Sequence, residues 1–177
     1  MATIITQRLK LELIKSDDVD DVYDYARDPL VSENTAWTYH KSIEDTKVFI
    51  EYVIMKNSSS IGQLNHVWGI QDKQKVKVIG TVSFKQDNEF EGHIDYALGK
   101  EYWNKGIITE AVSAVINWVF KNSPSIQHIN SGCLSRNIGS VKVLKKIGFK
   151  VVGKHTNIRG GKFQNLILET TLFSLKR

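Results

Sequence analysis

The segment from 107 to 120 most constrains what this chain can fold into. Its apolar residues recur at helical spacing, and they are Ile107, Ile108, Ala111, Val112, Val115, Ile116, Val119 and Phe120. This stripe is too wide for a helix that buries only one face. We therefore expect a central helix that other elements cover on more than one side. Ser113 and Asn117 interrupt the run, which is shorter than the roughly 20 apolar residues of a membrane span, so no membrane association is expected.

Before this helix the hydrophobic pattern has the period of a β-strand. Alternation over 6–13 predicts a first strand. Three further alternating runs, near 64–71, 76–84 and 92–98, are separated by short polar segments. They predict an antiparallel meander that leads directly into the central helix.

Two helices are expected between the first strand and the meander. Ser16 is placed to cap a helix over 17–27. Ser42, with Asp45 three residues later, forms a capping box for a helix over 43–56.

The elements after the central helix complete an α+β fold. A strand is predicted at 126–134, a short helix at 138–147 that ends at Gly148, and two closing strands near 150–157 and 163–174. Together these elements predict a mixed sheet of about seven strands flanked by about four helices.

Composition sets the general class of protein. The 177 residues are 41% hydrophobic and show no repeat or low-complexity tract, so we expect one globular domain over 1–177. Residues 1–12 lack the features of a secretory signal or a transit peptide. The single cysteine, Cys133, can neither close an internal disulfide nor build a zinc cluster, which favours a cytoplasmic protein.

The formal net charge of +5 favours anionic partners. These include nucleic acid, a ribosome surface and a nucleotide-containing cofactor, among which charge does not choose. Aromatic residues do not gather in a basic stripe, so nucleic acid is expected as a partner only through a ribosomal protein.

The segment 96–111 carries the strongest chemical signal, because it combines a strand end, a turn with Gly106 and a helix start. Free backbone N–H groups and the positive end of a helix dipole bind phosphate or diphosphate. Glycine lets the backbone approach such a group closely. The spacing fits neither the P-loop nor the dinucleotide-binding glycine pattern. An ordinary strand-to-helix connection remains the alternative.

A second segment, 137–149, follows about thirty residues later. Together the two segments resemble the acetyl-CoA site of the GNAT superfamily of N-acetyltransferases. They most resemble the branch with the Rim-type ribosomal-protein N-terminal acetyltransferases. The shared patterns are Tyr-Trp-x-Lys-Gly at 102–106, Thr-Glu-Ala at 109–111, Asn-x-x-Ser at 137–140 and Lys-x-Gly-Phe at 146–149. Arg8-Leu9-x-Leu11 and Gly161-Lys162-Phe163 also match, so the likeness spans nearly the whole chain.

The resemblance implies a fold and a reaction. The fold is a mostly antiparallel GNAT-like sheet in which strands 4 and 5 splay apart at a bulge beside Ala97 and Leu98. The reaction moves an acetyl group from acetyl-CoA, as co-substrate, to a primary amine by direct attack within a ternary complex. The amine belongs to a protein N-terminus or to a small molecule, and a homodimer is compatible with the family.

The resemblance also assigns the cofactor contacts to the strand end, the turn and the second segment. They are Ala97, Leu98, Trp103, Asn104, Lys105, Gly106, Ile107, Ile108, Thr109, Asn137 and Ser140. One of these positions has an alternative, purely structural role, and two depart from the family pattern. Asn137 is equally suited to cap the following helix. Asn104 stands where the branch often has glycine, and Ile108 where the family usually has a small residue.

The same resemblance supplies catalytic candidates. The Leu98 N–H is expected to bind the thioester oxygen, and the Ser140 hydroxyl to donate a hydrogen bond to the departing sulfur. His93 stands where the family commonly has a glutamate base, and its ordinary pKa of about 6.5 suits proton acceptance near neutral pH. Asp95, on the same strand face, is expected to orient His93 or to act through water. A merely structural, near-surface role for His93 remains equally open.

Other chemistries are less favoured. The histidines at 40, 66, 128 and 155 show no metal-ligand spacing, so no metal site is expected. Cys133 is interpreted as a core cysteine rather than as an acyl relay. Because of Ile108 and the missing glutamate, a non-catalytic acyl-CoA sensor or interaction module remains the alternative function, and a basic ribosome-associated protein is a third.

Overall fold

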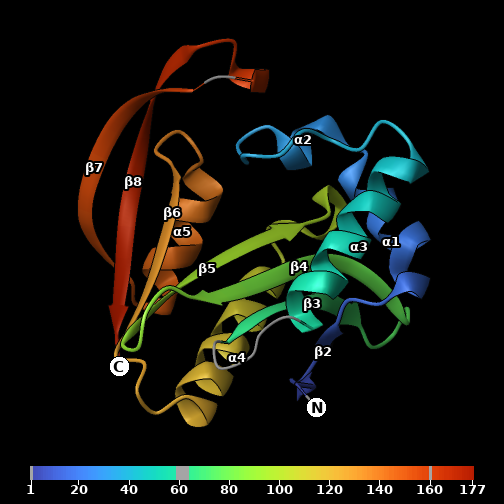
Figure 1. The fold of residues 1–177 in the computed structure, drawn as a ribbon, viewed down its shortest axis with the longest axis horizontal. Coiled ribbons are helices and arrows are strands. Elements are labelled where there is room, and N and C mark those ends of the chain that lie inside the picture. Colours follow the sequence, from blue (N-terminus) through green and yellow to red (C-terminus); the bar gives the residue numbers. More distant parts are fainter. Residues whose placement is uncertain (1, 59–63, 160) are drawn as a thin grey trace.

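The computed structural model describes residues 2–58, 64–159 and 161–177. In this part of the chain, eight strands form one sheet in the order β1-β2-β3-β4-β5-β6-β8-β7 (Figure 1). The strands are β1 (Ile4–Ile5), β2 (Leu9–Leu13), β3 (Asn65–Asp72), β4 (Lys77–Gln86), β5 (Glu91–Leu98), β6 (His128–Leu134), β7 (Lys150–Arg159) and β8 (Leu166–Lys176). The α-helices are α1 (Val19–Ala26), α2 (Pro29–Ser32), α3 (Ile43–Ser58), α4 (Ile107–Asn122) and α5 (Ile138–Ile147). Three short 3₁₀ segments are η1 (Ser16–Asp18), η2 (Lys100–Tyr102) and η3 (Gly161–Phe163).

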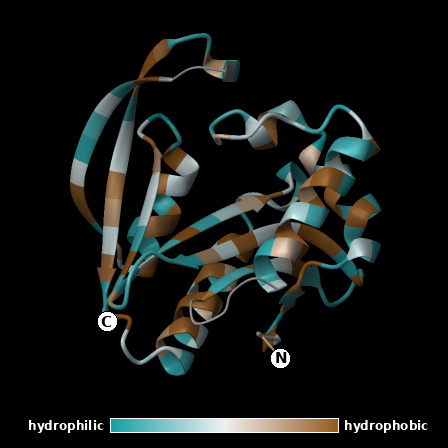
Figure 2. Cartoon of the chain, viewed as in Figure 1, coloured by the Kyte–Doolittle hydropathy of each residue, from teal (hydrophilic) through white to brown (hydrophobic). Residues whose placement is uncertain are grey.

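Helix α4 lies at the centre, as its apolar pattern predicts. Its residues Ile107, Ala111, Val112, Val115, Ile116 and Val119 are buried, and Ile108 and Phe120 pack against the same core. The sheet covers one side of α4 and α5 covers another. A second core joins α1 and α3 to the opposite face of the sheet. Figure 2 shows the hydrophobic residues on α4 and along the central strands.

The meander and the caps largely confirm the expected local structure. Strands β3, β4 and β5 pair in antiparallel order. Ser42 and Asp45 form the predicted reciprocal cap of α3, with Asp45 N–H to Ser42 Oγ at 3.3 Å and Ser42 N–H to Asp45 Oδ2 at 3.1 Å. Helix α5 has the predicted bounds.

Three local predictions were wrong. The first helix is split into η1 and α1, and Ser16 does not cap it; instead the Asp18 carboxylate accepts the Lys15 N–H at 2.8 Å. Helix α2 was missed, although Asp28 caps it and Pro29 occupies its first turn, a common helix start. Strand β1 was missed because two residues carry no periodic signal. Residue 160, in the turn between the closing strands, lies outside the described residues.

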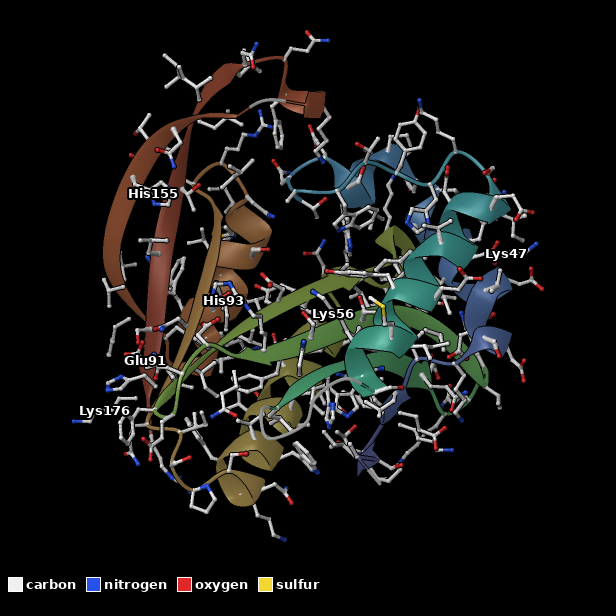
Figure 3. The ribbon with its side chains drawn as sticks, in the orientation of Figure 1. Lys47, Lys56, Glu91, His93, His155 and Lys176 are labelled. Carbon is white, nitrogen blue, oxygen red and sulfur yellow. The ribbon has the colours of Figure 1, made fainter. Side chains whose placement is uncertain are left out.

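Strands β5 and β6 form the parallel pair of the sheet, and they diverge. Their register runs only from Glu91↔His128 to His93↔Asn130, although both strands continue. In Figure 3 the labelled Glu91 and His93 lie on the part of β5 that still runs beside β6. The predicted splay between the fourth and fifth expected strands is therefore confirmed.

The predicted bulge beside Ala97 and Leu98 is wrong. The β4–β5 register is continuous from Gly80↔Leu98 to Gln86↔Gly92, and the irregularity in β4 instead faces β3, at Ile70/Gln71. Beyond the last paired residues, the Ser131 hydroxyl donates to the Ile94 carbonyl at 2.9 Å and replaces the backbone ladder. A side chain thus occupies the position where the two backbones would otherwise continue to pair.

Candidate active site

The divergence of β5 and β6 opens a cavity of about 610 Å³. Its lining includes Asp95, Tyr96 and Ala97 of β5, the end of β6 from Ser131 to Leu134, and Asn137 and Ser140 at the start of α5. The cavity therefore brings the end of β5 together with the second predicted cofactor segment. These two segments are about forty residues apart in the sequence.

The other end of the cavity is bounded by the α1–α3 side of the molecule. Trp37, His40 and Phe49 form a wall of tilted rings with centroid distances of 5.7 and 5.6 Å. Ser83 and Lys85 of β4 contribute polar groups. Burial lowers the pKa of His40, so this ring is neutral near pH 7. This end of the cavity therefore combines aromatic and polar side chains.

The main chain of Leu98 faces the open side of β5. Gly99 donates its N–H to the Ile79 carbonyl of β4 at 2.8 Å, so Gly99 belongs to the residues bonded to β4. Hydrogen-bonding direction alternates along an antiparallel strand, and the neighbouring Leu98 therefore turns its N–H and C=O away from β4. The β5–β6 ladder ends at His93. The Leu98 N–H thus points into the splay, where the sequence places an oxyanion donor.

Trp103 fixes this end of β5. Its indole Nε1–H donates to the Leu98 carbonyl at 2.8 Å, while the ring is 39% exposed. The bond satisfies the carbonyl that also faces the splay and leaves the Leu98 N–H as the open group. Trp103 therefore supports the end of the strand beside the turn.

The turn before α4 presents a row of free amides. In the described part of the chain, no N–H group from 104 to 109 donates a hydrogen bond. Asn104 and Gly106 both have positive φ, at 59° and 71°, which curls the turn. Such a concave backbone at the start of the 16-residue helix α4 is suited to bind an anion.

Two departures from the family pattern have a structural explanation. Asn104 replaces the glycine of the branch in the left-handed region, which asparagine tolerates better than other non-glycine residues. Ile108 is half-buried and packs against the main core, to which the buried Ile107 beside it also belongs. Their side chains are thus used for packing, and it is the backbone of this turn that is open.

At the start of α5, Asn137 and Ser140 both line the cavity. Asn137 caps the helix, because its Oδ1 accepts the Ser140 N–H at 3.2 Å. Ser140 lines the cavity, and its side chain also hydrogen-bonds to the Tyr96 hydroxyl. The Ser140 hydroxyl therefore lies at the cavity wall beside Tyr96.

Tyr96 is a lining residue that the sequence analysis did not single out. Its hydroxyl donates to the Ser140 carbonyl at 3.3 Å, across 44 positions in the sequence. Burial raises the pKa of Tyr96, so the phenol stays protonated and remains a donor. The signal available in the sequence was its position two residues before Leu98, but the contact with α5 is not local.

His93 and Asp95 form a pair, but only Asp95 lines the cavity. His93 Nε2 lies 3.4 Å from Asp95 Oδ1, and this hydrogen bond raises the pKa of His93 despite partial burial. Along a strand that rises about 3.3 Å per residue, His93 is roughly 16 Å and Asp95 roughly 10 Å from Leu98. Asp95 is therefore the nearer of the two to the splay.

Cys133 also lines the cavity and is only partly buried. The interpretation of Cys133 as a core cysteine did not predict this exposure to the cavity. Burial raises the pKa of its thiol to about 11. The thiol is thus protonated near neutral pH, where a nucleophile would need to be a thiolate. This state argues against an acyl relay.

Comparison with known proteins agrees with this geometry. A family model described as an acetyltransferase (GNAT) domain matches residues 8–150. The chain belongs to this GNAT acetyltransferase family. It is therefore an acetyl-CoA-dependent N-acetyltransferase, with acetyl-CoA as co-substrate and an amine as acceptor.

The relatives cover nearly the whole chain. The uncharacterized N-acetyltransferase p20 of Bacillus licheniformis is 28% identical over 99% of this chain and 96% of its own. A GNAT-family acetyltransferase structure from Bacillus anthracis is 20% identical, with a TM-score of 0.83 and 98% of both chains covered. A ribosomal-protein-S5-alanine acetyltransferase from Vibrio fischeri is 25% identical, with a TM-score of 0.77, covering 99% of this chain and 97% of that one. These neighbours are consistent with the Rim-type branch.

Among the described residues, no helix combines the length and hydrophobicity of a membrane span.

Proposed function

We propose that this GNAT acetyltransferase acetylates a primary amine by direct attack on acetyl-CoA within a ternary complex. The acceptor is an α-amine of a protein N-terminus or a small-molecule amine. The observation that carries the proposal is the row of free amides at 104–109 beside an open splay into which the Leu98 N–H points. The free amides at 104–109 grip the diphosphate of acetyl-CoA, and the Leu98 N–H receives the thioester oxygen.

Each step then has a group at the cavity or on β5 beside it. The amine nitrogen attacks the thioester carbon, and the Leu98 N–H stabilises the negative charge that develops on the carbonyl oxygen. The new C–N bond forms and the C–S bond breaks, so the sulfur leaves as a thiolate that accepts a hydrogen bond from the Ser140 hydroxyl. The proton lost by the amine passes toward Asp95 and His93 through water. No covalent enzyme intermediate is needed, because an acetyl thioester is already activated.

The pair of His93 and Asp95 gives this proposal a pH signature. A base must be neutral to accept a proton, so activity is lost as the pH falls through the pKa of His93, which Asp95 raises above its usual 6.5. Asp95→Asn removes the charge that stabilises protonated His93, and the acidic limb of kcat/KM should move to lower pH. Both enzymes are measured with one acceptor, so that the titration of the acceptor amine is common to both.

A control variant separates the base from the acceptor. In the pH profile of kcat/KM, Asp95→Asn shifts the loss of activity that comes from protonation of His93. His93→Gln removes this titrating group, so that part of the acidic limb should disappear. If the limb is the same in all three enzymes, the amine alone titrates and the pair has no part in proton transfer.

The proposed reaction itself is tested by thiol release. Mixing the enzyme, acetyl-CoA and amines from a panel of N-terminal peptides and small amines should release free CoA thiol in proportion to acetylated amine. The position of His93 outside the cavity lining keeps a non-catalytic acyl-CoA-binding module as the second candidate. Tight CoA binding with no thiol release across the whole panel would favour that module.

A further inference from the structure

Arg8 and Glu110 come from two separate sequence motifs and are joined in the structure. Arg8 Nε lies 2.7 Å from Glu110 Oε2, and the Arg8 backbone N–H donates to Glu110 Oε1 at 3.1 Å, across 102 positions in the sequence. The Thr6 hydroxyl donates to the same Oε1 at 2.5 Å. The segment just before β2 is thereby bonded to the first turn of α4.

The same guanidinium also holds the turn that precedes α4. Arg8 Nη1 donates to the Lys105 carbonyl at 2.9 Å. The C=O of Lys105 and the N–H of Gly106 belong to one planar trans peptide, in which they point in opposite directions. By holding the carbonyl on one side of the turn, Arg8 aims the Gly106 N–H at the other side, where the free amides gather.

Glu110 is itself fixed at both ends. Its backbone N–H donates to the Gly106 carbonyl at 3.1 Å. Burial raises the pKa of its carboxyl, but hydrogen bonds from Thr6 and Arg8 outweigh this, so the pKa is lowered and the group is ionised. The peptide before Gly106 is thus held by Arg8, and the peptide after Gly106 by Glu110, the residue to which Arg8 is paired.

We propose that Arg8 is a positioning residue for the diphosphate of acetyl-CoA, acting through the Lys105–Gly106 peptide and depending on Glu110. This inference rests on the proposed role of the 104–109 turn. It assigns a task to the Arg8-Leu9-x-Leu11 motif, which lies outside the cofactor segments recognised in the sequence. Arg8 acts by orienting the backbone and does not itself contact the phosphates.

The sign of one substitution separates positioning from simple charge attraction. If Arg8 acted as a positive charge near the phosphates, Glu110→Gln would remove a competing negative charge and tighten acetyl-CoA binding. If Arg8 positions the turn, Glu110→Gln loosens Arg8 and weakens binding. The two mechanisms therefore predict opposite changes in affinity.

The test measures acetyl-CoA dissociation constants by calorimetry for the wild type, Arg8→Gln, Arg8→Lys, Glu110→Gln and a charge-matched control, Lys10→Gln. Lys10 lies on β2 and pairs with Glu12 at 2.9 Å. We expect Arg8→Gln to weaken binding by about tenfold, the loss of a charge-assisted hydrogen bond. Arg8→Lys, whose single ammonium cannot serve both Glu110 and Lys105, should be nearly as weak. Lys10→Gln should bind like the wild type.

A shorter thioester supplies the second readout. Turnover of acetyl-pantetheine, which lacks the diphosphate, should be the same in Arg8→Gln and the wild type, whereas the KM for acetyl-CoA rises about tenfold at similar kcat. Unchanged acetyl-CoA affinity in Arg8→Gln, tighter binding in Glu110→Gln, or an equal loss with acetyl-pantetheine would each overturn the inference. If the wild type binds acetyl-CoA but acetylates no amine, the catalytic proposal fails while the binding arm still tests Arg8.

Discussion

Leu98→Pro should lower kcat by about 10² to 10³-fold while the enzyme stays folded and still binds acetyl-CoA, because it deletes one oxyanion donor. Proline lacks the N–H, and at this position the N–H faces the splay and not the β4 ladder. The β4–β5 pairing is therefore preserved. The preceding residue, Ala97, lies in a strand, which is the conformation that proline favours in its neighbour. The measurement is steady-state kinetics at saturating acetyl-CoA.

Leu98→Val is the matched control for this variant. The Leu98 side chain is buried, with 6% exposed, so both substitutions disturb packing, but valine keeps the backbone N–H. Valine should lower stability modestly and leave kcat within a few-fold of the wild type. Equal losses of kcat in the two variants would show that packing, and not the amide, supports catalysis.

Gly106→Glu should weaken acetyl-CoA binding by about 100-fold or more. A carboxylate roughly 6 Å from a phosphate charge costs about 3 kcal/mol at an effective dielectric constant of about 20. There is room for the side chain, since a Cβ at Gly106 would approach only Arg8 Nη2, at 3.7 Å. Calorimetry with CoA measures the loss directly.

Gly106→Gln separates the charge from the strain. At a φ of +71° either side chain costs about 1–2 kcal/mol of stability, which the melting temperature reports for both variants. Glutamine, without a charge, should lose about tenfold or less in affinity. Should the two variants bind CoA equally well, the diphosphate does not lie against this turn.

Most of the fold was predictable because its signals are local. The apolar stripe of α4, the alternation along β3 to β5 and the spacing of α5 each lie within one element, and their bounds agree with the structure to within about two residues. Capping was predictable for α3, where Ser42 and Asp45 bond each other. It was not predictable for η1, where several acidic residues compete and Asp18 turns back to Lys15.

The candidate site divides in the same way. Free amides at 104–109 follow from a glycine turn before a helix, which the sequence shows directly. The contacts that tie this turn to the rest of the molecule do not, because Arg8 meets Lys105 and Tyr96 meets Ser140 only after the sheet has formed. The predicted bulge came from family likeness alone and was wrong, since the β4–β5 register runs through Ala97 and Leu98 without a shift.

The central claim is that the backbone amides of 104–109 grip the diphosphate of acetyl-CoA. The most direct measurement is a set of ¹H–¹⁵N correlation spectra of the labelled enzyme, recorded during titration with CoA and, separately, with pantetheine. We predict large downfield proton shifts and slowed hydrogen exchange for amides of this turn with CoA, and much smaller changes there with pantetheine. Saturation by CoA with these amides unshifted and still exchanging freely would contradict the account.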